Sequence, residues 1–333
     1  MQKNNRQFRL AARPFGLPKR TDWAVTDIPV SEPGEGQLLA EVMYISLDPA
    51  MRGWMDDRKS YLPPLAIGEV MRAGAVGKVI ASKNARFREG DYVYGSLGVQ
   101  QYAVSDGKGL TKVDATLMPL TKYLGVLGIA GLTAYFGLLD ICSPKAGETL
   151  VVSGAAGAVG EITAQIGKIK GCRVVGIAGG PEKCQYLADT LGLDAVIDYK
   201  NENVRKALKA ACPNGIDIYF DNVGGEILNE VLAQINFKAR ISLCGAISQY
   251  NATEMPKGLS NYGSLIINRA KMEGFIVFDY AARYMEAIGE LAGWMSQGKL
   301  HTREHIEEGI DHFPEVFLKL FSGENHGKLI LKV

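Results

Sequence analysis

The stretch Ser153-Gly154-Ala155-Ala156-Gly157-Ala158-Val159-Gly160 decides the fold of this 333-residue chain. An apolar run at residues 149–152 precedes it, and an amphipathic run at residues 161–170 follows it. This order predicts a strand, a tight glycine turn and a helix, as in the first βα turn of a dinucleotide-binding unit. In such a turn a pyrophosphate binds the free N–H groups at the N-terminus of the helix.

The glycine spacing assigns a role to positions in this turn. The spacing is Ala155-x-Gly157-x-x-Gly160, with alanine where the first glycine usually stands. Gly157 leaves room for a phosphate to approach the backbone, and Gly160 lets the helix pack closely on the strand. A glycine turn that serves only packing is the alternative. The second apolar strand expected at residues 172–178 favours nucleotide binding, because it completes the βαβ order.

Composition and charge argue against several other classes of protein. The chain is 47% hydrophobic and 22% charged, which is typical of a soluble globular protein, and its net charge of +1 gives no electrostatic case for nucleic acid or a membrane surface. No apolar run approaches the roughly 20 residues of a membrane span, and the polar residues 1–9 do not resemble a signal peptide. We therefore expect a cytoplasmic protein. The five cysteines are scattered without a C-x-x-C pair, so the sequence indicates neither disulfides nor structural zinc.

The secondary-structure pattern changes at about residue 124. Before it, short strands at residues 38–45, 75–81, 92–95 and 102–104 are separated by glycine and proline, which predicts a β-rich domain. After it, strands and helices alternate, which predicts a parallel sheet with helices on both faces. The expected strands are 150–152, 173–178, 195–198, 216–221 and 240–245, and the helices between them end at residue 170 or span 182–191, 204–211 and 226–235. A long polar loop at 246–271, a strand at 275–278 and a helix at 282–295 follow. The tail at 328–333 is expected to return as a strand to the first domain. The predicted domains are thus 1–124 with 300–333, and 125–299.

The end of the second strand indicates which dinucleotide binds. NAD-binding units usually place an acidic residue there for the ribose 2′-OH, but here the strand ends in Ala178-Gly179-Gly180-Pro181. Glu182 falls inside the next helix, and Lys183 follows it with a cation that suits a 2′-phosphate. Tyr199, after the third strand, could hydrogen-bond the same phosphate. Lys183 could also be an ordinary solvated helix residue, but the missing acid and the present base together favour NADP.

Five longer stretches make the sequence similar to a known family. They are residues 131–139 (GLTAYFGLL), 153–160 (SGAAGAVG), 219–225 (YFDNVGG), 244–251 (CGAISQYN) and 272–275 (MEGF). These stretches resemble the zinc-independent medium-chain dehydrogenases/reductases, in the branch of prostaglandin reductase, plant double-bond reductase and bacterial curcumin reductase. The resemblance extends from about residue 8 to the C-terminus.

This resemblance implies both a fold and an activity. The fold is α/β: a Rossmann domain with a doubly wound parallel sheet, plus a chaperonin-10-like (GroES-like) β-rich domain, usually in a homodimer with the active site in the cleft. Members of the family reduce the C=C bond of small α,β-unsaturated ketones and aldehydes with NADPH. By position, the family's cofactor contacts fall on Gly157, Ala158, Val159, Gly160, Lys183, Tyr199, Asn222, Cys244, Gly245, Ala246, Ile247, Ser248, Tyr250, Phe275, Ile276, Val277 and Asn325.

Two tyrosines are candidate catalytic residues for such a reaction. Hydride addition to the β-carbon of an enone moves negative charge to the carbonyl oxygen, and a hydroxyl that hydrogen-bonds this oxygen can relay a proton. Tyr61 and Tyr250 match substrate-pocket tyrosines of the family. The chain holds 14 tyrosines, so packing is the alternative for either one. The cofactor's own ribose hydroxyl is a third candidate donor.

Metal-dependent chemistry is not expected from the histidines. Zinc relatives with this two-domain plan need Cys and His ligands, whereas all four histidines here follow residue 300. His301 and His305 are four residues apart and could share a helix face, but no third ligand lies nearby in the sequence. Two other functions stay open: a quinone oxidoreductase of the same superfamily, and a non-catalytic NADPH-binding protein.

Overall fold

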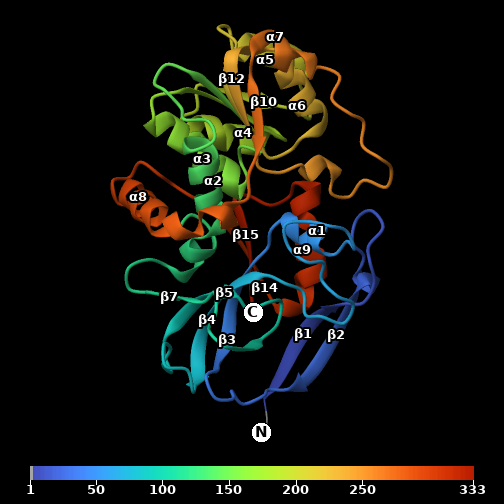
Figure 1. Ribbon diagram of the computed structural model, residues 1–333, viewed down its shortest axis with the longest axis vertical. Coiled ribbons are helices and arrows are strands. Elements are labelled where there is room, and N and C mark those ends of the chain that lie inside the picture. Colours follow the sequence, from blue (N-terminus) through green and yellow to red (C-terminus); the bar gives the residue numbers. More distant parts are fainter. Residues whose placement is uncertain (1–2) are drawn as a thin grey trace. The chain divides into compact units, whose positions relative to one another are not determined.

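The computed structural model describes residues 3–333 and divides them into two units (Figure 1). One unit runs up to Gly125 and includes Glu304–Val333, and the other is Val126–Arg303. The predicted boundaries, after residues 124 and 299, differ from these by one and four residues. Met1 and Gln2, which begin the predicted first domain and its polar N-terminal segment, lie outside the described residues.

The first unit is built from two sheets. Strands β1 (Asn4–Leu10) and β2 (Trp23–Pro29) form an antiparallel pair. The larger sheet has the order β14-β15-β3-β4-β5-β7, with β6 paired to β3. Its strands are β3 (Leu38–Ser46), β4 (Gly74–Ser82), β5 (Tyr92–Ser96), β6 (Tyr102–Ser105), β7 (Thr111–Val113), β14 (Glu304–Glu308) and β15 (Lys328–Lys332).

The core of this unit lies between the strands and one amphipathic helix. Helix α9 (Phe313–Ser322) buries Phe313 and Phe317, and the ring of Phe313 packs edge-on against Phe8 of β1 at 5.3 Å. The short helix α1 (Ala50–Trp54) follows β3.

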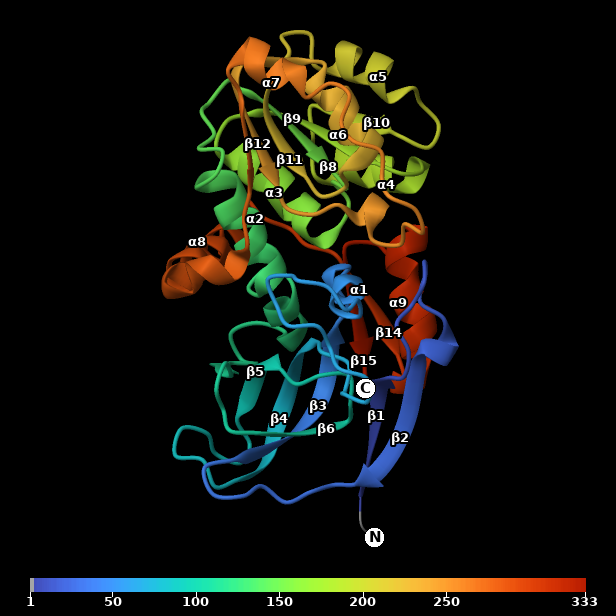
Figure 2. The same cartoon turned by 45° about the vertical axis from the view of Figure 1, so that its right-hand side comes forward.

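The C-terminal tail pairs with the N-terminal part of the chain, as the sequence predicts. Strand β15 is antiparallel to β3, with Ile330 opposite Ser46, and parallel to β14 (Figures 1 and 2). Residues Leu329, Ile330 and Leu331 are buried, so this pairing makes the tail part of the core of the first unit.

The second unit is a doubly wound α/β domain (Figure 2). Its six-stranded parallel sheet has the order β10-β9-β8-β11-β12-β13. The strands are β8 (Thr149–Ser153), β9 (Arg173–Ala178), β10 (Ala195–Asp198), β11 (Ile216–Asp221), β12 (Ile235–Leu243) and β13 (Lys271–Gly274). The chain therefore reverses its direction of winding between β8 and β11, which is the switch point where such sheets bind ligands.

The connecting helices begin and end close to polar or glycine signals in the sequence. They are α2 (Ile129–Leu139), α3 (Ala158–Ile169), α4 (Pro181–Gln185), α5 (Val204–Ala211), α6 (Gly225–Leu232), α7 (Gly263–Asn268) and α8 (Tyr284–Ser296). Asn203 caps α5 by accepting the Lys206 N–H, and Gly171 follows α3 with a φ of 80°.

Four predicted elements differ clearly from the structure. The helix predicted at 226–235 ends at Leu232. Strand β12 begins at Ile235, five residues before the strand expected at 240–245. A register shift inside β12 interrupts the alternation of apolar and polar side chains that would have predicted its first half. The predicted loop at 246–271 contains α7. The strand predicted at 275–278 is wrong: β13 ends at Gly274, and the apolar residue Phe275 instead packs its ring on Phe220.

Candidate cofactor site

The glycine turn after β8 opens into a helix N-terminus whose first N–H groups have no partner within the helix. The Glu161 N–H donates to the Gly157 carbonyl at 2.9 Å, so the N–H groups of residues 158–160 come before the first helical hydrogen bond. Gly157 is the N-cap of α3, and no side chain caps this end. These groups suit a pyrophosphate, as the sequence predicts for Gly157, Ala158, Val159 and Gly160.

Position 160 in this turn tolerates no side chain. A β-carbon built on Gly160 would lie 2.1 Å from the Gly154 carbonyl oxygen, which is far inside van der Waals contact. The close approach of α3 to the end of β8 therefore depends on glycine here. The backbone at Gly154 itself has a φ of 58°. Both observations fit the cradle that a dinucleotide phosphate requires.

A buried aspartate joins the two strands at the switch point. Asp221 is fully buried at the end of β11, and one of its carboxylate oxygens accepts hydrogen bonds from Ser153 Oγ at 2.9 Å and Tyr219 OH at 2.8 Å. The same oxygen accepts the N–H groups of Val223 and Gly224, each at 2.9 Å. Burial and the neighbouring Asp221 raise the pKa of Tyr219, so that its hydroxyl stays a donor. Asp221 is not among the residues predicted from the sequence, although a carboxylate at the end of an apolar strand is a signal for such a role.

This network places Asn222 against the glycine turn. The Asn222 amide donates to the Ser153 carbonyl at 2.7 Å, and its backbone N–H donates to Ser153 Oγ at 3.0 Å. The predicted cofactor residue Asn222 thus lies beside the end of β8.

The segment after β12 folds back onto the end of β11. The N–H groups of Cys244 and Gly245 donate to the Asp221 carbonyl at 2.9 and 3.0 Å. The Ile247 N–H donates to the Asn222 carbonyl at 3.3 Å, and Ser248 Oγ donates to the Val223 carbonyl at 2.6 Å. The structure therefore brings the predicted residues 244–248 together with Asn222 at the carboxyl edge of the sheet.

The side chain of Tyr250 folds back onto the start of this segment. The Ala246 N–H donates to the Tyr250 hydroxyl oxygen at 3.2 Å. A phenolic hydroxyl can accept one hydrogen bond and donate another, so this contact is compatible with a role as proton donor. Tyr250, predicted both as a cofactor contact and as a proton donor, is thus held close to the 244–246 turn.

Residues 275–277 leave the same edge of the sheet after β13. A β-carbon on Gly137 of α2 would lie 2.3 Å from the ring of Phe275, so this ring packs directly on the α2 backbone. Val277 is buried, and its carbonyl accepts the Tyr284 hydroxyl at 3.0 Å. The segment that contains the predicted contacts Phe275, Ile276 and Val277 is therefore anchored at both ends.

Positive charge gathers at the end of β9, where a 2′-phosphate is expected. Lys183 lies half-buried in α4, and Tyr199 follows β10. A β-carbon on Gly179 would lie 2.8 Å from the Tyr199 ring and 3.0 Å from Lys200 Cε, so both side chains cover this glycine. Burial lowers the pKa of the Lys183 ammonium group, and the charges of Lys200 and Arg303 lower it further. Lys183 and Tyr199 are predicted from the sequence, whereas Lys200 and Arg303 are not.

Two predicted site residues belong to the first unit. Tyr61 is 45% exposed, and its hydroxyl oxygen accepts Trp54 Nε1–H at 3.1 Å. Asn325 donates its side-chain amide to the Gly327 carbonyl at 3.1 Å. Both stay predicted contacts.

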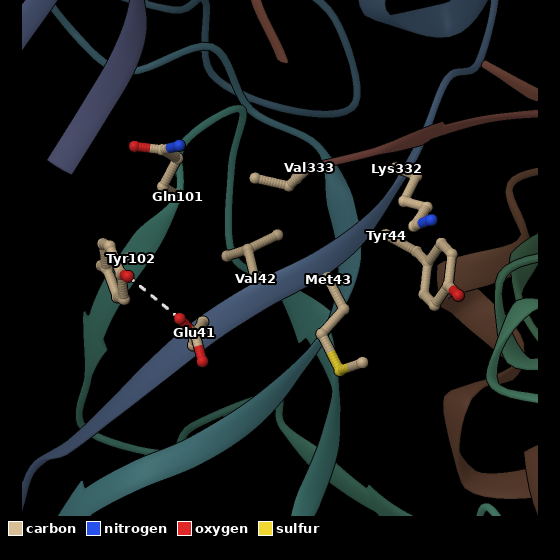
Figure 3. A pocket seen from close by; sticks show the side chains of 8 residues that line it. All are labelled: Glu41, Val42, Met43, Tyr44, Gln101, Tyr102, Lys332 and Val333. Atoms are coloured by element: carbon tan, nitrogen blue, oxygen red, sulfur yellow. Dashed lines mark hydrogen bonds between the residues drawn. The ribbon is translucent and has the colours of Figure 1, made fainter. Parts of the chain in front are cut away.

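A hollow of about 310 Å³ lies on the larger sheet of the first unit (Figure 3). Tyr102 donates its hydroxyl to Glu41 at 2.9 Å across one side of it. The lining residues are Glu41, Val42, Met43, Tyr44, Gln101, Tyr102, Lys332 and Val333, and none of them is a predicted site residue.

The histidines are arranged differently from the helical pair that the spacing allows. Residues Glu304–Glu308 form strand β14, so His301 and His305 do not share a helix face. Among residues 3–333, no group of three or more His, Cys, Asp or Glu side chains is placed to hold a metal ion. In the same residues, no helix has the length and apolarity needed to cross a membrane.

Comparisons with known proteins agree with this architecture. The family described as "N-terminal domain of oxidoreductase" matches residues 6–113, and that described as "Zinc-binding dehydrogenase" matches residues 158–293. The NADPH-dependent curcumin reductase of Escherichia coli (strain K12) is 44% identical, over 100% of this chain and 98% of its own. The 2-alkenal reductase (NADP(+)-dependent) of Nicotiana tabacum is 38% identical, over 99% and 98%. The crystal structure of CurA from Vibrio vulnificus in complex with NADPH superposes with a TM-score of 0.94 at 47% identity, over 98% and 99%.

This fold and the two family matches define an oxidoreductase of the medium-chain dehydrogenase/reductase class. The chain belongs to that family, in the branch of prostaglandin reductase, plant double-bond reductase and bacterial curcumin reductase.

Proposed function

We propose that this chain, an NADP-dependent oxidoreductase, reduces the C=C bond of α,β-unsaturated ketones and aldehydes without a metal. The observation that supports this function best is the arrangement at the switch point of the six-stranded sheet, where the glycine turn and the cations after β9 lie at the carboxyl ends of the strands. In addition, the chain is 44% identical to a curcumin reductase. NADPH, when bound, supplies a hydride for the β-carbon.

The chain's own residues hold and orient the cofactor. The N–H groups of residues 158–160 bind the pyrophosphate, and Lys183 with Tyr199 binds the 2′-phosphate. Asn222 and residues 244–248 line the cofactor further along the edge, where the Asp221 network holds them in place. Preorganisation of this kind lowers the entropic cost of aligning cofactor and substrate.

A hydroxyl group stabilises the negative charge that forms on the substrate oxygen. The Tyr250 hydroxyl oxygen accepts the Ala246 N–H, and the Tyr61 hydroxyl oxygen accepts Trp54 Nε1–H, so a neighbouring donor orients each hydroxyl. Either hydroxyl can hydrogen-bond the enolate oxygen and deliver a proton. The cofactor's ribose hydroxyl is the alternative donor.

A turnover screen tests this function. NADPH oxidation is followed with an enone, an enal and a quinone, each before and after exhaustive chelation. We expect turnover of the enone and enal, with saturated carbonyl products and no loss after chelation. Turnover of the quinone alone would establish a quinone oxidoreductase. Tight NADPH binding without any acceptor would indicate the non-catalytic alternative.

We also propose a homodimer in the cytoplasm. Strand β13 forms an edge of the six-stranded sheet, and α7, which contacts β12, exposes Ile266 at 75% and Ile267 at 71%. An edge strand beside exposed apolar side chains suits pairing with a second copy. All five cysteines are free thiols, which agrees with a reducing compartment.

A further inference from the structure

Arg303 is fixed to the helix that opens the phosphate turn. Its backbone N–H donates to Glu161 Oε1 at 3.2 Å, and its guanidinium carbon lies 4.0 Å from the centroid of the Tyr186 ring. Tyr186 donates its hydroxyl to the other oxygen of Glu161 at 3.0 Å. Glu161 is 1% exposed and stands directly after Gly160 in α3. The buried carboxylate therefore positions both the arginine and the ring on which it stacks.

The backbone just before Arg303 is fixed in the same way. Gln165, one turn further along α3, donates its side-chain amide to the His301 carbonyl at 2.8 Å and accepts the His301 N–H at 2.8 Å. The backbone of residues 301–303 is thus hydrogen-bonded to α3 at two positions, which fixes the point from which the Arg303 side chain extends.

Arg303 stacks on Tyr186, which lies three residues after Lys183 in the helical segment that follows β9. With Lys183 and Lys200 it forms a group of three cations. Its charge and that of Lys200 reach Lys183 and lower its pKa in addition to the effect of burial. Lys200 covers Gly179 with its side chain. The Glu182 carboxylate offsets part of this positive charge. The Asp198 carboxylate accepts hydrogen bonds from the N–H groups of Gly180 and Lys200 and from the Asn201 amide. Three like charges repel one another, and a dianion among them relieves that repulsion.

We propose that Arg303 and Lys200 join Lys183 in binding the 2′-phosphate of NADPH, and so determine the preference for NADPH over NADH. Arginine suits this role because its planar group can stack on Tyr186 while its N–H groups face phosphate oxygens. The proposal rests on the assignment of NADPH as cofactor. It concerns binding alone, so it can fail while C=C reduction stands.

Binding of nucleotide fragments tests it without any substrate. The dissociation constants of 2′,5′-ADP and of ADP, which lacks the 2′-phosphate, are measured by calorimetry. Arg303→Gln should weaken 2′,5′-ADP about 5- to 50-fold and Lys200→Gln about 3- to 10-fold, while ADP changes less than about twofold. Arg303→Lys should retain part of the affinity, because the charge remains. Each loss should also make 2′,5′-ADP binding less dependent on salt.

Matched controls separate a phosphate contact from general effects. Lys206→Gln on exposed α5 removes one positive charge elsewhere in the same unit and should change neither constant. Lys200 is exposed, so its variant tests the proposal even if Arg303→Gln fails to fold. Equal weakening of both nucleotides, or unchanged affinity for 2′,5′-ADP in both variants, would overturn the proposal.

Discussion

Lys183 is the residue on which cofactor choice depends most directly. Lys183→Ala should raise the Michaelis constant for NADPH and leave that for NADH nearly unchanged. A lost charge-assisted phosphate contact is worth about 1.5–3 kcal/mol, or roughly 10- to 150-fold. Because burial and two neighbouring cations lower the pKa of Lys183, NADPH affinity should also begin to fall at a lower alkaline pH than for an ordinary lysine. Steady-state kinetics with both cofactors across pH measure this, and equal effects on both would show that Lys183 does not contact the phosphate.

The two tyrosines can be told apart by how their hydroxyls are held. If Tyr250 or Tyr61 donates to the enolate, Tyr→Phe at that position should lower turnover roughly 10- to 1,000-fold with little change in substrate binding, because the charge on oxygen grows in the transition state. Tyr250→Phe also leaves the Ala246 N–H without its acceptor, so the affinity for NADPH is measured alongside. Near-normal turnover in both single variants and the double variant would leave the cofactor ribose or water as the donor.

The turn between β8 and α3 is the element whose geometry matters most. Gly160→Ala should lower the free energy of unfolding by about 2–3 kcal/mol and weaken NADPH binding, because its β-carbon would meet the Gly154 carbonyl. Gly289→Ala is the matched control: this residue lies inside α8, no atom lies within 4 Å of its β-carbon position, and alanine should add about 0.5–1 kcal/mol. Chemical denaturation of both variants measures the difference. Equal stability of the two variants would contradict the close-approach argument.

Elements bounded by clear turn signals could be predicted well from the sequence. The bounds of β9, β10, α5 and β11 agree with the expected ranges, because apolar runs there are separated by clear turns. Strand β1 was not predicted, since its inward positions include Asn5 and Gln7, whose amides are satisfied by hydrogen bonds to residues 100–102. The strand at 275–278 was placed wrongly because Phe275 is apolar for packing on α2 and Phe220.

In the candidate site, too, local features could be predicted and features that depend on distant contacts could not. The phosphate turn and Lys183 are predicted from local motifs alone. Asp221 and Arg303 contribute through contacts between distant segments, and the Arg303–Glu161 hydrogen bond spans 142 residues. A single sequence contains no signal for such a pairing.

At the scale of the whole molecule, the chain should be a dimer of 36.1-kDa subunits. Light scattering of the purified protein should give about twice that mass. A double change of Ile266 and Ile267 to Glu should yield monomers, because it places charge beside the edge strand. Leu117→Glu, at an equally exposed site (74%) in the first unit, should leave the dimer intact. A monomeric native protein at about 10 μM would show the dimer proposal to be wrong.

The central claim is that the second unit presents NADPH to a C=C bond. The most direct measurement uses NADPH labelled with deuterium at C4 of the nicotinamide on the transferred face, with an α,β-unsaturated ketone as the acceptor. Mass spectrometry and NMR then locate the label in the product. The account predicts a saturated ketone with deuterium at the β-carbon and a solvent proton at the α-carbon. An allylic alcohol with deuterium at the carbonyl carbon would contradict it.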